Sequence, residues 1–85
     1  MKTHVFRDNV NIHVPGSDPG ARFYAWCWHT HFHGESGVSG KALFLVMNQQ
    51  LILYHAAATV DHARGEVIIT FPHEDDLTQF VLTWS

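Results

Sequence analysis

Eighty-five residues make a single domain, 1–85, and a chain of this length buries only about 60–65% of the surface that its unfolded form exposes. The charged fraction of 15% is low beside the roughly 25% of an average globular protein. It indicates either an apolar face kept for a partner or the apolar atoms that every small domain exposes. The net charge of −3, with five scattered basic residues, excludes the basic stripe that direct nucleic-acid binding needs.

Cysteine content and apolar run length bear on the compartment. The single cysteine, Cys27, excludes an internal disulfide and fits a reducing environment. The longest apolar run, 42–47, has six residues, whereas crossing a bilayer takes about 20. We therefore expect a soluble, cytoplasmic protein with no membrane-spanning segment.

The first half of the chain predicts strands separated by loops. Alternating apolar residues predict a short strand over 10–14. Two Pro-Gly pairs predict an exposed loop at 15–20. Segment 21–33 is rich in aromatic residues and holds no Gly or Pro, which predicts the longest strand. The glycines and serines of 34–40 predict a second loop.

Segment 41–63 has two interpretations. As strands, its two apolar runs flank a turn at 48–50; as a helix, it ends before Gly65, a good C-terminal signal. The apolar residues would occupy every side of a helix in the first half, which favours the hairpin. A helical turn at 56–58 stays open because alanine favours it.

The C-terminal region predicts a turn at 63–65 and a strand over 66–71. After Pro72, the acidic residues suit the start of a helix, or one helical turn at 73–77 leads into a strand over 79–84. The strand-forming residues near the end favour the second interpretation. The predicted fold is mainly β (or α+β), a compact single-domain antiparallel sheet of about five to six short strands with at most one short helix.

Strand geometry divides the side chains of 21–33 between two faces, because successive residues of a strand point to opposite sides. One set forms a predicted core face of Tyr24, Trp26, Trp28 and Phe32. The other set ends in three histidines that we expect at the surface, facing a partner: His29, His31 and His33.

The histidines also form a metal-binding pattern. Residues two apart on a strand lie ~6.6 Å apart, close enough for two imidazoles to share Zn²⁺ or another divalent transition metal. The pattern His29-x-His31-x-x-x-Glu35 resembles the first metal motif of the cupin family, whose ligands lie on a β-barrel. Phe23 and Ala42 stand where a cupin has glycines, and no second motif follows. The resemblance implies a metal site at these three residues; no other cofactor is expected.

The chain shows no catalytic motif, and we assign no catalytic residue. The leading hypothesis is a small non-enzymatic module that binds another protein or a second copy of itself, of the kind with which phages and mobile elements inhibit a host complex. A metal-binding β protein and a structural assembly component are the alternatives. The predicted interaction surface consists of His29, His31, His33, Glu74, Asp75 and Asp76.

Overall fold

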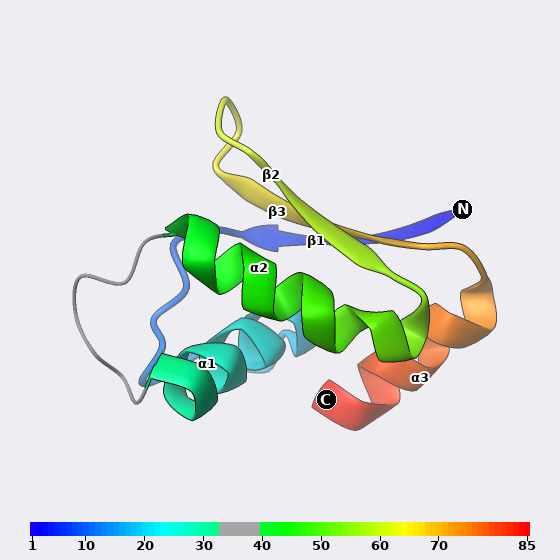
Figure 1. Cartoon of the computed structure of the whole chain (residues 1–85), viewed down its shortest axis with the longest axis horizontal. Helices are drawn as coiled ribbons and strands as arrows, with labels where there is room; N and C mark the ends of the chain where they lie inside the picture. The colour runs from blue at the N-terminus through cyan, green and yellow to red at the C-terminus, as the bar shows by residue number, and fades with distance from the viewer. Residues whose placement is uncertain (33–39) are drawn as a thin grey trace.

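The computed structural model describes residues 1–32 and 40–85. Within these ranges, three α-helices pack against one side of a three-stranded sheet (Figure 1). None of the helices there has the length and apolarity that crossing a membrane requires. The elements follow in the order β1 (Lys2–Arg7), α1 (Pro19–Phe32), α2 (Gly40–Leu51), the 3₁₀ turn η1 (Ile52–Tyr54), β2 (Ala57–Asp61), β3 (Glu66–Phe71) and α3 (Glu74–Trp84).

The sheet has β3 at its centre, antiparallel to both neighbours, in the order β1-β3-β2. Alternate residues of β3 point toward the helices, so Val67, Ile69 and Phe71 are fully buried. Phe6 of β1 lies opposite Val67, and Ala58 of β2 lies opposite Ile69. The core therefore lies between the sheet and the helical layer.

The fold is α+β, and the expectation of five to six strands with at most one short helix is wrong. The sequence predicts a strand over 21–33, but residues 21–32 lie in helix α1, and residue 33 lies outside the described residues. The Asp18 Oδ1 atom accepts a hydrogen bond from the Ala21 N–H at 3.1 Å, and Pro19 occupies the first helical position. A capping aspartate followed by proline is a helix start signal, and here it outweighs the strand propensity of the aromatic residues.

Segment 41–63 combines the two interpretations, because a helix over its first half precedes a strand. The turn expected at 48–50 lies inside α2. Leu43, Met47 and Leu51 are spaced by four residues and form one buried stripe, which is how a helix contacts a core. The apolar residues on the other sides of the segment were taken as evidence against a helix. The helix forms nevertheless and leaves some of them exposed to solvent, as Leu45 shows with 63% of its surface exposed.

The ends of the chain correct two further expectations. The first strand spans Lys2–Arg7 and not 10–14. Residues 73–84 form α3 and not a turn followed by a strand, since three acidic residues lie in the first helical turn, where the N-terminal dipole favours them. The strand predicted over 66–71 is confirmed as β3.

Phe80 of α3 is the centre of the aromatic core. Its ring centroid lies 5.4 Å from that of Phe23, 5.4 Å from that of Phe71 and 5.5 Å from that of Tyr54. The pairs with Phe23 and Tyr54 are edge-to-face, and such pairs add about 0.5–1.5 kcal/mol each beyond the area that they bury. One side chain thus joins α1, β3, η1 and α3.

The four side chains predicted to form a core face, Tyr24, Trp26, Trp28 and Phe32, do not share one side of the helix, and none of them is fully buried. Tyr24, Trp28 and Phe32 pack against the core while partly buried. Trp26 is 39% exposed, and its ring lies 5.3 Å from that of Trp84. The buried residues of α1 are Gly20, Ala21, Phe23, Ala25 and Cys27.

The contact between β1 and the start of α1 requires glycine at position 20. A Cβ atom built on Gly20 would lie 2.6 Å from Phe6 Cε1 and 2.9 Å from His4 Cδ2. The same junction is joined by Asp18 Oδ1, which accepts a hydrogen bond from His4 Nε2 at 3.0 Å. A larger residue at position 20 would have to displace the buried ring of Phe6.

We predict that Gly20→Ala lowers the free energy of unfolding by about 1–3 kcal/mol, because the added methyl group overpacks this junction. Gly40→Ala is the matched control. No heavy atom lies within 4 Å of a Cβ atom there, so this change should be neutral or stabilise by about 0.4–1 kcal/mol. Urea unfolding of both variants provides the measurement, and equal stabilities would contradict the prediction.

Candidate functional site

The histidine surface was predicted from strand geometry, whereas His29 and His31 lie on helix α1. Side chains two residues apart on a helix are rotated by ~200° and do not face each other. His29 Nε2 donates a hydrogen bond to the Ile12 carbonyl at 2.9 Å, and its ring lies 5.6 Å from that of His13. His31 instead packs edge-on against Trp26 at 5.9 Å. The two histidines therefore have different neighbours, and the strand geometry behind a shared metal ion does not apply.

The remaining members of that set, His33 and Glu35, lie outside the described residues. Residues 1–32 and 40–85 contain no group of three or more His, Cys, Asp or Glu side chains arranged to hold a metal ion. Metal binding by His29, His31 and Glu35 thus stays a prediction from the sequence.

Cys27 is fully buried among the core side chains of α1. Burial raises the pKa of its thiol to about 12, because the thiolate would lose its hydration. The thiol therefore stays protonated at neutral pH, and it is a packing group in this fold.

The three predicted acidic residues occupy the first turn of α3. Glu74 and Asp75 are exposed. Asp76 is 21% exposed and accepts a hydrogen bond from His55 Nδ1 at 3.5 Å. This contact places the acidic turn next to η1, at the C-terminal end of α2.

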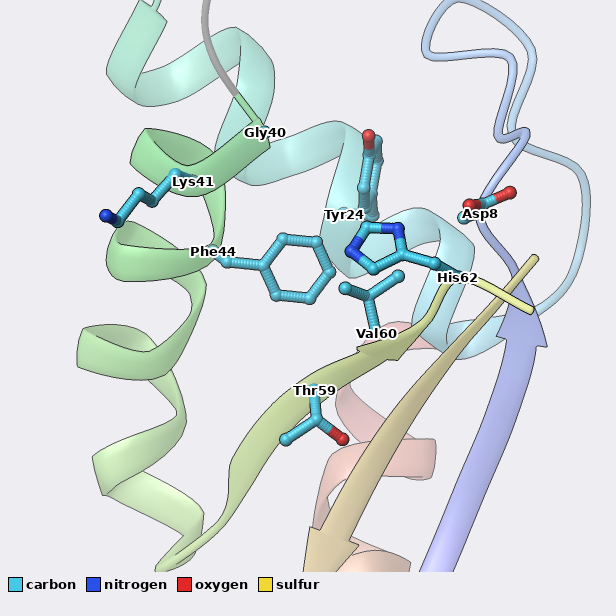
Figure 2. Close-up of a pocket in the computed structure, with 8 residues that line it drawn as sticks. All are labelled: Asp8, Tyr24, Gly40, Lys41, Phe44, Thr59, Val60 and His62. Atoms are coloured by element: carbon cyan, nitrogen blue, oxygen red, sulfur yellow. The ribbon is translucent and has the colours of Figure 1, made fainter. Parts of the chain in front are cut away.

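A groove with a volume of about 720 Å³ lies between α2 and β2 (Figure 2). Phe44 from α2, Tyr24 from α1 and Val60 from β2 point into it, whereas Lys41 points outward. Its size is that of a small-molecule or side-chain pocket. The residues that line it are Asp8, Tyr24, Gly40, Lys41, Phe44, Thr59, Val60 and His62.

Asn48 of α2 bonds to the edge strand β2, and the groove lies between these two elements. Its Nδ2 atom donates to the Phe44 carbonyl at 2.9 Å and to the Ala58 carbonyl at 3.3 Å. Its Oδ1 atom accepts from the Ala58 N–H at 2.8 Å. Because backbone groups alternate direction along an antiparallel strand, those of Val60, two residues on, face the same way and lie in the groove.

Tyr24 contributes a phenol side chain to the groove. Burial raises its pKa above 10.0, and the negative charge of Asp8 raises it further. Asp8 is positioned by its own N–H, which donates to the Gly65 carbonyl at 2.9 Å. At neutral pH the groove therefore carries a phenol O–H beside a carboxylate.

The outer face of α2 continues from the groove and was missed by the sequence interpretation. This face comprises Ala42, Leu45 and Gln49 of α2 and continues, at helical spacing, through Ile52 and Leu53 of η1; the name covers all five residues. Leu45, Ile52 and Leu53 are 63%, 68% and 78% exposed. A shallow hollow of about 500 Å³ along α2 shares residues with the groove. The spacing of 3, 4 and 3 residues from 42 to 52 could have predicted this face, because it is typical of one side of a helix. It was overlooked because the segment was interpreted as a hairpin.

We predict that Asn48→Ala lowers the free energy of unfolding by about 1–3 kcal/mol, because the Ala58 backbone loses both of its bonds to the amide. Amide hydrogen exchange at Ala58 should accelerate. Gln49→Ala, one residue on and exposed, is the control and should change stability by less than about 0.5 kcal/mol. Comparable losses in the two variants would contradict this role for Asn48.

We predict that Tyr24 ionises above pH 10.0, measured as phenolate absorbance in a Tyr54→Phe background that leaves one tyrosine. Asp8→Asn should lower this pKa without returning it to the ordinary value, since burial is the larger cause. The neutral phenol is favoured in the folded state, so the associated stability holds below pH ~10 and is lost as pH rises through the raised pKa. Asp75→Asn is the control, and an equal shift there would contradict the assignment.

Comparison of this chain with protein-family models, with curated proteins and with solved structures found no match. Its function is therefore argued from the geometry of the α2 surface and the groove beside it.

Proposed function

We propose that this chain is a small non-enzymatic module that works by binding another protein through the outer face of α2. The supporting observation is the composition of that helix. From Gly40 to Tyr54 the only charged residue is Lys41, and three large aliphatic side chains on the outer face are more than half exposed. A surface helix normally carries polar or charged residues outward, whereas a helix that is apolar on all sides is normally covered.

The groove extends this contact surface. Phe44 and Lys41 line both the groove and the shallow hollow along α2, so the two depressions are continuous. A partner seated on the outer face of α2 would have an apolar recess for one of its side chains, next to the phenol of Tyr24 and the carboxylate of Asp8. Interfaces commonly combine such an anchor pocket with a flatter apolar area.

Two features support binding over catalysis. The one cysteine is buried with a pKa of about 12, so its thiol is not a nucleophile at neutral pH. His29 bonds to the Ile12 carbonyl, whereas His31 packs against Trp26. The two imidazoles therefore do not face one shared site in which they could act on a substrate together.

The partner in this proposal is another protein, a second copy of the chain, or both. The narrower form is a cytoplasmic phage or mobile-element protein that inhibits a host complex. Its support is the small size, the low charged fraction of 15% and the net charge of −3. The exposed acidic turn of α3 beside η1 would then favour a basic surface on the partner.

A photo-crosslinking experiment tests the proposal. Benzoylphenylalanine replaces Leu45 or Leu53 on the outer face of α2. The control positions are Val14, between β1 and α1, and Leu82 on α3, where exposure is similar at 72% and 70%. Irradiation of cells that make each variant should give protein adducts at the two α2 positions and few at the controls.

A second substitution sharpens the result. Leu45→Glu should abolish adduct formation by the probe at position 53, because a carboxylate on the contact surface would be desolvated there. Circular dichroism provides the check that the fold is retained, as expected for a side chain that is 63% exposed. Adducts that are equally abundant at control positions, or absent at both α2 positions, would overturn the proposal.

A further inference from the structure

Resting on the proposed function, we propose that the protein covering the outer face of α2 is a second copy of this chain, bound through an antiparallel pair of α2 helices. The face has the spacing of a helix–helix seam, because Ala42, Leu45, Gln49 and Ile52 follow one another by 3, 4 and 3 residues. This alternation is the a/d pattern by which two helices interdigitate. Leu53 lies beside the seam and widens it.

The register of an antiparallel pair follows from the positions of the exposed aliphatic residues. A two-fold axis between positions 48 and 49 brings Leu45 of each copy level with Ile52 of the other, because helices rise ~1.5 Å per residue. Gln49 then lies near the axis, where the two amides can hydrogen-bond to each other. A single polar pair within an apolar seam is a recognised device for fixing register and orientation.

Charges at the two ends of the seam favour this orientation. Lys41 is exposed at the N-terminal end, and it takes part in none of the ion pairs among the described residues. At the other end, the hydrogen bond from His55 to Asp76 joins the acidic first turn of α3 to η1.

The antiparallel register places these opposite charges together. Lys41 comes level with the end of η1 in the second copy, where His55 contacts the acidic turn of α3, and the two-fold axis repeats the contact. A parallel pair would set lysine against lysine and acid against acid, and like charges repel. The surface is thus complementary to itself in one orientation only.

The size of the contact sets its expected strength. One pair of helices about 18 Å long, from position 41 to 53, makes an interface at the small end of the usual range, where complexes are weak and transient. We therefore expect a monomer–dimer equilibrium that is visible between about 10 μM and about 1 mM chain. The dissociation constant should rise with ionic strength, because the two terminal charge contacts are solvent-exposed.

A charge-swap experiment tests the arrangement by sedimentation equilibrium. Lys41→Glu, and separately the double variant Glu74→Lys/Asp75→Lys, should each raise the dissociation constant of the dimer about tenfold, because each reverses the charge at two symmetric contacts. An equimolar mixture of the two variants should form a heterodimer, detected by native mass spectrometry, in which opposite charges meet again. Lys2→Glu, the same charge change on β1, is the control and should leave the equilibrium unchanged.

Three outcomes decide the matter. Restoration of the dimer in the mixture supports the antiparallel pair, and a mixture no better than either variant overturns it. Because lysines at the start of α3 can weaken that helix, Leu45→Glu provides a second test that leaves α3 intact, and a dimer that survives this substitution also overturns the proposal.

A wild-type chain that stays monomeric at 1 mM overturns the second copy as the partner. In that case, crosslinks from position 45 to proteins of other mass would leave the proposed function standing. Adducts of twice the chain mass support the dimer directly, and the absence of any adduct at positions 45 and 53 overturns both.

Discussion

The bonds between the Asn48 amide and the backbone of Ala58 determine how the helical layer meets the sheet. They satisfy the outward-facing N–H and C=O of the edge strand β2 and draw α2 alongside that edge. A bare edge strand is a template for uncontrolled pairing, and covering it with a helix is one of the ways in which proteins prevent this. The groove lies between α2 and β2, with Phe44 on one side and Val60 on the other (Figure 2).

This position of α2 also accounts for its unusual exposure. The helix lies at the margin of the sheet, so only the stripe of Leu43, Met47 and Leu51 is fully buried. Its opposite side projects away from the core, yet it is aliphatic and nearly uncharged. The folding of the single chain therefore leaves apolar area exposed on one helix, and the proposed binding role would cover that area.

The helix α1 separates groups that its sequence places close together. His29 is drawn to the Ile12 carbonyl, whereas His31 packs on Trp26, and Cys27 is sealed in the core. The segment is held in this form by a cap at Asp18 and by close packing of Gly20 on Phe6. Of the predicted metal-binding pattern, the two histidines that the structure describes therefore lie on a helix with different neighbours.

By itself the sequence determined the strand over 66–71, the turn before it, and the low charge that indicates an uncovered surface. Only the tertiary structure decided that 21–32 and 41–51 are helical, because short apolar segments satisfy strand and helix periodicities equally well until a cap or a core contact selects one. The groove could not be predicted from local sequence patterns. Tyr24, Phe44 and Val60 are 16 to 36 residues apart in the chain, and they meet only because α2 is bonded to the edge of β2.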